Sequence, residues 1–195
     1  MSLRIRQRAG ACALFGCVLL AGGVLTACDE PPPPPAEGGF GLTLNDTGVD
    51  CNLATHDALV GDVGSSGTNT LATDGLDSAK VSCTVEASAT GFFIEASIAK
   101  GPSLVVSVDM SSANTADNPA TGNVSYVSTD TGGDVYNSPT ATPCQFWIEG
   151  GEYVQAGAAW VSFSCDEVAN EGNTCKVTNG VFEVRNCEGA TNDEG

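Results

Sequence analysis

Cysteine thiols are the groups of this chain whose positions point most directly to chemistry, and there are nine of them. One, Cys28, follows a basic start, an apolar stretch over residues 11–25 and two small residues. A thiol placed there is a site for lipid attachment, because a signal peptidase cuts after small residues and a thioether can form only on a thiol. We therefore predict that residues 1–27 are a removed signal peptide and that Cys28 becomes the first residue.

The residues Leu25-Thr26-Ala27-Cys28 resemble the lipobox of bacterial lipoproteins at all four positions. The resemblance implies a diacylglyceryl thioether on Cys28, cleavage before it, and acylation of the new amino group by a fatty acid such as palmitate. Two or three acyl chains anchor a protein, because each buried CH₂ contributes roughly 0.8 kcal/mol. An ordinary secretory signal and a transmembrane helix are the alternatives, but the apolar run is shorter than the roughly 20 residues that a spanning helix needs.

The expected localisation is therefore extracytoplasmic, in a bacterial cell envelope, with the membrane as a partner through the lipid anchor. Asp29 directly follows the lipidated cysteine. In enteric bacteria this arrangement retains lipoproteins in the inner membrane, but other lineages do not follow the rule. We expect the outer membrane rather than the inner membrane.

Six cysteines remain once Cys12 and Cys17 leave with the signal and Cys28 is acylated. An even set in an oxidising compartment predicts three disulfides, although six cysteines allow 15 connectivities. Zinc is the alternative, but no pair has the spacing of zinc ligands and the chain has one histidine, His56. We expect neither a metal nor a cofactor, and disulfides among Cys51, Cys83, Cys144, Cys165, Cys175 and Cys187.

The chain is strongly acidic, with 24 Asp and Glu against 7 Lys and Arg and a net charge of −17. Three of the basic residues lie in the signal peptide, so the mature protein is more acidic still. Such a surface repels nucleic acid and anionic headgroups, and we expect no nucleic acid partner. The acidic residues are scattered singly, which is typical of a solvated surface.

Residues 28–39 are expected to be a tether that neither buries apolar surface nor pairs as strands. Pro31 to Pro35 favour the polyproline conformation, which extends by about 3.1 Å per residue. Residues 40–195 then form a single β-rich domain.

Alternation of apolar and polar residues with a period of two predicts the fold. It is clearest in residues 80–87, 92–98 and 104–110, which we expect to form a meander with one face in water. We predict an all-β protein, an antiparallel β-sandwich of about seven to nine strands with disulfides, whose further strands lie at 123–128, 144–149 and 158–165.

An Asn-Gly pair at 179–180 lies between two β-prone runs and predicts a two-residue hairpin turn. That register sets Cys175 opposite Val184 and leaves Cys187 three residues further on. A direct bridge between these two cysteines is then disfavoured, and we expect each to pair with an earlier cysteine.

Residues 45–79 are the least patterned part of the domain, with one helical turn expected around 54–60. The segment is either a binding lid or a crossing pinned by Cys51, and we favour the crossing. Its oxygen-bearing side chains are candidate calcium ligands without EF-hand spacing, and turn formation is the favoured explanation for them. They are Asn45, Asp46, Asp50, Asp62, Asp74 and Asp77.

Nucleophilic catalysis is not indicated. His56 and Asp57 are adjacent, which does not form a relay, and no Gly-x-Ser-x-Gly elbow is present. Paired carboxylates for glycoside hydrolysis cannot be recognised among so many acidic residues. We expect that the protein is not an enzyme.

Two tryptophans give the sharper binding hypothesis. If Phe146 and Phe163 point inward, strand alternation points Trp147 and Trp160 outward, where they are candidates for ligand binding by stacking on sugar rings or by a protein contact. Coverage of the rings by residues 45–79 or by another sheet is the alternative, and the favoured one, because tryptophan is usually buried where it can be.

The spacing of Val81-Ser-Cys83-Thr-Val, Pro143-Cys144, Trp160-Val-Ser-Phe163-Ser-Cys165, Cys175 and Cys187 resembles a group of small, uncharacterised, cysteine-containing lipoproteins of myxobacterial type. That resemblance implies a disulfide-linked exported β-domain and no activity. The expected function is a non-enzymatic envelope lipoprotein with a binding or structural role at the cell surface, and a glycan or an envelope protein is a candidate partner. The alternative is a carbohydrate-binding or adhesion module that uses the outward tryptophans. The oligomeric state stays open.

Overall fold

The structure is a computed structural model that describes residues 31–64 and 69–189, and the backbone alone for residues 45–49. The predicted signal peptide and Cys28 lie outside the described residues. From Pro33 on the chain forms one unit. Within the described ranges, no helix is long and apolar enough to cross a membrane.

Twelve strands make up the regular structure of the described residues. They are β1 (Glu37–Asp50), β2 (His56–Val60), β3 (Ala72–Thr73), β4 (Lys80–Ala87), β5 (Phe92–Ala99), β6 (Ser103–Met110), β7 (Ala120–Val127), β8 (Tyr136–Asn137), β9 (Cys144–Trp147), β10 (Tyr153–Gln155), β11 (Ala158–Asn170) and β12 (Asn173–Arg185).

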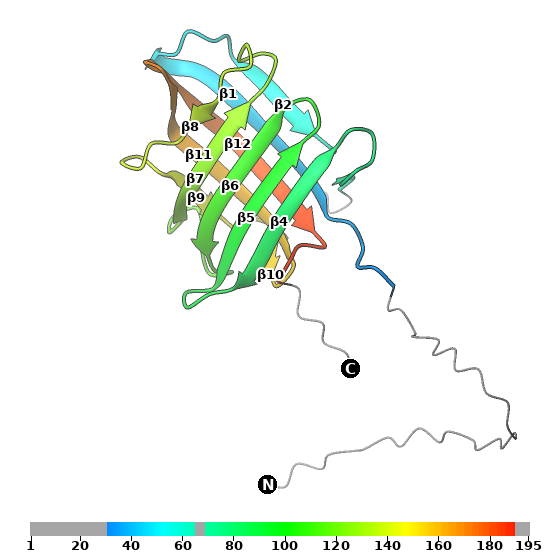
Figure 1. The fold of residues 1–195 in the computed structure, drawn as a ribbon. Helices are drawn as coiled ribbons and strands as arrows, with labels where there is room; N and C mark the ends of the chain where they lie inside the picture. Colours follow the sequence, from blue (N-terminus) through cyan, green and yellow to red (C-terminus); the bar gives the residue numbers. More distant parts are fainter. Residues whose placement is uncertain (1–30, 65–68, 190–195) are drawn as a thin grey trace, which may run out of the picture. The chain divides into compact units, whose positions relative to one another are not determined.

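All strands belong to one antiparallel sheet with the order β2-β1-β12-β11-β8-β7-β6-β5-β4, in which β9 also joins β7 to β11. The sheet folds over, so that the layer of β4 to β7 crosses the layer of β1, β12 and β11 (Figure 1). The predicted all-β, antiparallel architecture is confirmed. The strand number exceeds the prediction because β3, β8 and β10 are pairings of two or three residues.

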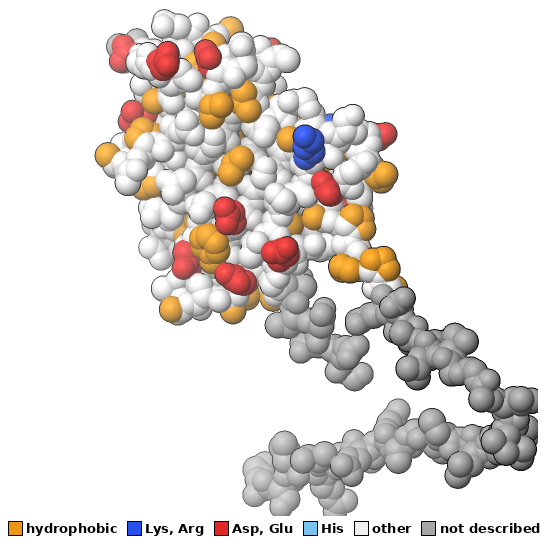
Figure 2. All heavy atoms as spheres, in the orientation of Figure 1, with side chains coloured by type: hydrophobic (Ala, Val, Ile, Leu, Met, Phe, Trp, Pro, Cys, Tyr) orange, Lys and Arg blue, Asp and Glu red, His pale blue; other side chains and the backbone are white. Residues whose placement is uncertain are grey.

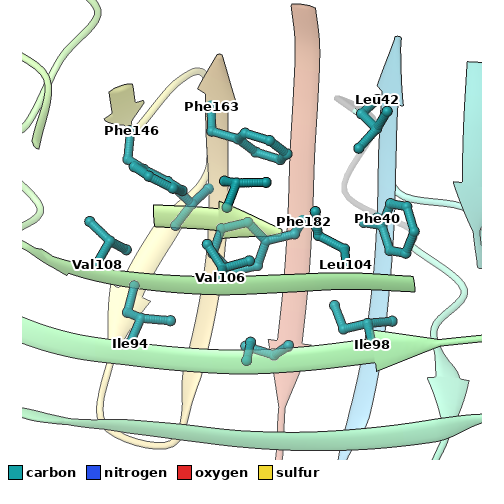
Figure 3. Packing of buried hydrophobic residues seen from close by; sticks show 14 of the residues in the cluster. Phe40, Leu42, Ile94, Ile98, Leu104, Val106, Val108, Phe146, Phe163 and Phe182 are labelled. Carbon is teal, nitrogen blue, oxygen red and sulfur yellow. The ribbon is translucent and has the colours of Figure 1, made fainter. Parts of the chain in front are cut away.

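The predicted meander is confirmed, since β4 pairs with β5 and β5 with β6 in unbroken antiparallel register. Its inward residues are buried, and Figure 3 shows several of them facing the strands of the other layer. Its outer face carries the alternate residues, and Figure 2 shows this side mainly as uncharged polar surface with scattered carboxylates.

Aromatic side chains fill the space between the layers. Phe40, Phe146, Phe163 and Phe182 are fully buried there (Figure 3). The rings of Phe146 and Phe163 stack with centroids 5.7 Å apart, and Phe163 meets Phe182 at 6.2 Å. Burial of this apolar surface is the main favourable term in folding.

The predicted hairpin turn at Asn179-Gly180 is wrong, because β12 runs through both residues. The turn between β11 and β12 falls at Glu171-Gly172, and both residues have positive φ. Asn179 adopts a φ of 51° where the register with β11 shifts, so the pair makes a bulge. Gly180 is required there, since a Cβ would lie 2.6 Å from the carbonyl oxygen of Phe163.

Three disulfides link Cys51 to Cys175, Cys83 to Cys187 and Cys144 to Cys165, with Cα atoms 4.7, 4.8 and 4.2 Å apart. Their number is the predicted one. Cys175 and Cys187 each pair with an earlier cysteine, as expected, although Cys175 opposes Val168 rather than Val184. Cys51 pins the crossing that follows β1.

The beginning of the sheet differs from the sequence expectation. Glu37 pairs with Arg185 and Gly38 with Val184, so residues 37–39 are strand rather than tether. The two glycines are there for close packing, because a Cβ on Gly38 would lie 2.9 Å from Ile98 and one on Gly39 would lie 2.6 Å from Val63. The helical turn expected around residues 54–60 is also wrong, since this segment pairs with β1 as β2.

The outer edge of β4 is occupied by the segment that follows β12. The N–H of Val85 donates to the carbonyl of Glu188 at 2.8 Å, and the N–H of Glu188 donates to the carbonyl of Cys83 at 3.0 Å. The Cys83–Cys187 disulfide holds the same junction. An edge strand presents unpaired backbone groups, and this segment satisfies part of them.

Candidate functional site

The two tryptophans lie on the outer face of β9 and β11. On β9, Cys144 and Phe146 point into the core, and Trp147 points away from it. Trp147 pairs with Ser162, and Trp160 is two residues earlier on β11, so the two indoles are diagonal neighbours on one face. The alternation therefore placed both side chains correctly.

Their exposure differs. Trp147 is half-buried, whereas Trp160 is 7% exposed. Trp160 pairs with Tyr153 of β10 and Glu183 of β12, and the Tyr153 ring meets it edge-on with centroids 6.4 Å apart. The structure thus brings the tryptophans together but covers one of them, so they do not form a platform of two exposed rings.

A hollow of about 640 Å³ lies beside the indoles. Its lining combines apolar rings with carboxylates, hydroxyl and amide groups, and residue 64 of the crossing segment closes one side. The lining residues are Gly64, Trp147, Glu149, Gly150, Glu152, Trp160, Ser162, Asn179, Gly180 and Val181.

A turn of residues 149–152 forms one wall and is fastened to β11 by Glu152. One oxygen of that carboxylate accepts from the N–H of Glu149 at 2.8 Å and of Ser162 at 3.1 Å. The other accepts from the Ser162 hydroxyl at 2.6 Å. Burial raises the pKa of Glu152 above its ordinary value, the three hydrogen bonds oppose this rise, and the negative charge of Glu149 adds to it.

Replacement of Glu152 by glutamine is expected to change how stability depends on pH. A carboxyl with a raised folded-state pKa stabilises the fold below its ordinary value of 4.5, and that contribution is lost as the pH rises through the folded-state pKa. Glutamine keeps one oxygen for the two N–H groups and offers an amide to Ser162, without the charge. In urea unfolding, the free energy of unfolding of Glu152→Gln should therefore rise relative to that of the wild type as the pH increases above 4.5. A constant difference from pH 4 to pH 7 would contradict this.

Trp160 carries an unsatisfied donor. Its indole Nε1 is buried and has no hydrogen-bond partner among the described residues. Trp147, in contrast, donates from Nε1 to the Glu149 carboxylate at 3.3 Å. A buried donor without an acceptor costs about 1–3 kcal/mol, and the described residues supply no acceptor for this one.

A fully buried carboxylate, Glu183, lies on β12 opposite Trp160. It accepts from the Tyr153 hydroxyl at 3.0 Å, from Arg185 Nε at 2.7 Å and from the Asn69 amide. Asn69 in turn accepts from the N–H of Gly64 at 3.1 Å. Glu183 therefore holds the crossing segment at the edge of the hollow.

The tyrosine of this cluster is perturbed as well. Burial raises the pKa of Tyr153, and the negative charge of Glu183 raises it further. The phenol accordingly stays protonated and keeps donating to Glu183.

His56 lies elsewhere, on β2. Its Nδ1 lies 3.0 Å from the carbonyl oxygen of Ala54 and its Nε2 lies 3.3 Å from the hydroxyl of Tyr126. Asp57 points to the other face of the strand and accepts from the Thr43 hydroxyl at 2.7 Å. These two residues do not act on one another.

Two of the acidic residues considered as calcium ligands take part in local structure. Asp74 accepts from the N–H of Val81 at 2.8 Å, and Asp62 bridges to Thr70 through its backbone. In the part of the chain that the structure describes, no three His, Cys, Asp or Glu side chains converge as metal ligands would. The side chains of Asn45 and Asp46 are not described.

The sequence did not single out Glu149, Glu152, Ser162 and Glu183. All four lie on the outward side of strands or in turns, where acidic and hydroxyl residues are ordinarily solvated. For two of them the sequence holds a signal, because Ser162 follows Trp160 by two residues and Glu149 follows Trp147 by two. No such spacing points to Glu152 or Glu183.

No family model matches the chain, and no curated protein or solved structure is significantly similar to it.

Proposed function

We propose that the protein is a non-enzymatic, lipid-anchored lipoprotein of a bacterial cell envelope, whose disulfide-linked β-domain has a binding role at the cell surface. The lipobox-like residues 25–28 support the anchor and the export. Three disulfides in the domain support an oxidising compartment, because such bonds persist outside the reducing cytosol. The outer membrane is the proposed location.

The observation that carries the binding role is the hollow beside Trp147 and Trp160. Ligand sites are concave, largely apolar and equipped with a few polar groups that fix orientation, and a volume of about 640 Å³ lies within their usual range. Trp147 is the accessible ring, and Trp160 belongs to the wall.

Removal of the lipidated thiol tests the anchor. We expect that the native product begins at Cys28, carries acyl mass and sediments with membranes, and that Cys28→Ser loses the acyl mass and becomes soluble because its apolar anchor is gone. Intact mass spectrometry of the unreduced protein and membrane fractionation measure both properties. Cys12→Ser is the matched control, since this cysteine leaves with the signal and the mature mass stays the same.

A native product that keeps residues 1–27, or that starts elsewhere without acyl mass, would overturn the anchor. Alkylation of the same unreduced sample should leave the six domain cysteines unlabelled. Labelling of any of them in the native protein would count against the oxidising compartment.

A carbohydrate-binding or adhesion module is the second candidate function. The half-buried Trp147 favours it, because one indole face at the rim of a hollow suffices for stacking on a sugar.

A further inference from the structure

We infer that the hollow binds the ring of an uncharged saccharide, which stacks on Trp147 and gives a hydroxyl oxygen to Nε1 of Trp160. The inference rests on the binding role proposed above and names the ligand class of that site. It follows from the charge of the lining, from its hydrogen-bonding groups and from the orientation of Trp147.

The charge of the lining excludes anionic ligands. Glu149 and Glu152 carry its charge, and none of the described lining residues is Lys, Arg or His. The whole chain has a net charge of −17, which adds a repulsive field. A phosphate, a sulfate or a uronic acid would meet carboxylates and no cation.

The hydrogen-bonding groups favour a polyol over a cation. An amine would satisfy the carboxylates but offers no acceptor to the indole N–H of Trp160, which has no partner in the described structure. A hydroxyl both donates and accepts, so neighbouring hydroxyls of one ring can serve the carboxylate of Glu149 and the donor of Trp160. Nε1 is covered in the free protein, so the inference requires that the Trp160 indole turns toward the ligand on binding.

Trp147 is prepared for stacking. Its Nε1 donates to Glu149 at 3.3 Å, and this bond restrains the plane of the indole at the rim of the hollow. The C–H face of a pyranose packs on such a ring, which buries apolar surface on both partners. Trp160, 7% exposed, takes part through its edge.

The test uses the purified native lipoprotein in detergent micelles. A glycan array that carries neutral and acidic oligosaccharides is probed first. The neutral glycans that bind are then titrated as methyl glycosides, with methyl glucuronide and tetramethylammonium as the anionic and cationic probes and with tryptophan fluorescence as the readout. We expect saturable binding of at least one neutral glycoside and none of glucuronide or tetramethylammonium.

Variants identify the site. Trp147→Ala should weaken binding at least about tenfold, whereas Trp147→Phe keeps a stacking face and should retain part of it. Trp160→Phe keeps a ring but removes the donor, so it should weaken binding by about tenfold while the melting temperature stays near that of the wild type. Phe93→Ala, on the outer face of β5 and outside the hollow, is the matched control and should bind normally.

Three results would overturn the inference: no neutral glycan bound on the array, tetramethylammonium bound in place of sugars, or wild-type binding by both Trp147→Phe and Trp147→Ala. Intact mass of the same preparation reports the acyl group on Cys28 separately. A failure of the saccharide inference is thereby distinguished from a failure of the lipoprotein assignment.

Discussion

Replacing Cys83 and Cys187 together by alanine is expected to lower the free energy of unfolding by about 4–5 kcal/mol. The bridge closes a loop of 104 residues, and a longer loop removes more entropy from the unfolded chain. The same change should loosen the segment that covers the edge of β4. Urea unfolding of the unreduced protein measures the first effect, and faster hydrogen exchange at the N–H of Val85 measures the second.

The matched control is the double alanine variant of Cys144 and Cys165, which are 21 residues apart. Its expected cost is about 3 kcal/mol, because the loop is shorter. An equal or greater cost than for Cys83 and Cys187 would contradict the loop-length argument, and unchanged exchange at Val85 would contradict the role of the bridge at the sheet edge.

Replacing Glu183 by alanine is expected to cost about 2–3 kcal/mol and to disturb the hollow. The change leaves the Asn69 amide and the Tyr153 hydroxyl without their buried acceptor. Arg185 is 40% exposed, so water can solvate it and the cost stays below that of breaking a fully buried ion pair. The measurements are the urea midpoint and the absorbance titration of Tyr153, whose pKa should fall because the charge of Glu183 no longer opposes ionisation.

Glu95→Ala is the control, since Glu95 lies on the outer face of β5 and its replacement should change stability by less than about 0.5 kcal/mol. If Glu183→Ala were no more costly than Glu95→Ala, the crossing segment would not depend on this carboxylate.

The parts of the fold that the sequence predicts well are those in which local pattern and burial agree. Residues 80–110 alternate strictly and are joined by short turns, so the meander could be placed almost to the residue. The turn predicted at Asn179-Gly180 was wrong because these residue types favour a left-handed backbone conformation, which occurs in bulges as well as in hairpin turns. Whether such a pair forms a bulge or a turn depends on the length of the partner strand. Gly38 and Gly39 were assigned to the tether because glycine is typical of linkers. Their role in close packing against Ile98 and Val63 depends on the tertiary structure and is not visible in the local sequence.

For the candidate site, the sequence predicted the direction of the tryptophan side chains but not their exposure. Alternation around Phe146 and Phe163 placed Trp147 and Trp160 on the outer face, and the structure agrees. Whether a ring on that face meets water depends on what crosses over it, and here Tyr153 packs on Trp160. Glu183 has the sequence context of a solvated residue and is nevertheless fully buried, and side chains distant in the sequence, those of Asn69 and Tyr153, contact its carboxylate.

The pairing of β1 with β12 has a consequence for biogenesis. Glu37, near the beginning of the domain, pairs with Arg185, near its end, so the central ladder forms only after nearly the whole domain has been synthesised. Until then β1 lacks its partner β12, and pairings of such long sequence separation form slowly. Completion of the β1–β12 ladder should therefore lag behind formation of the local meander of β4, β5 and β6.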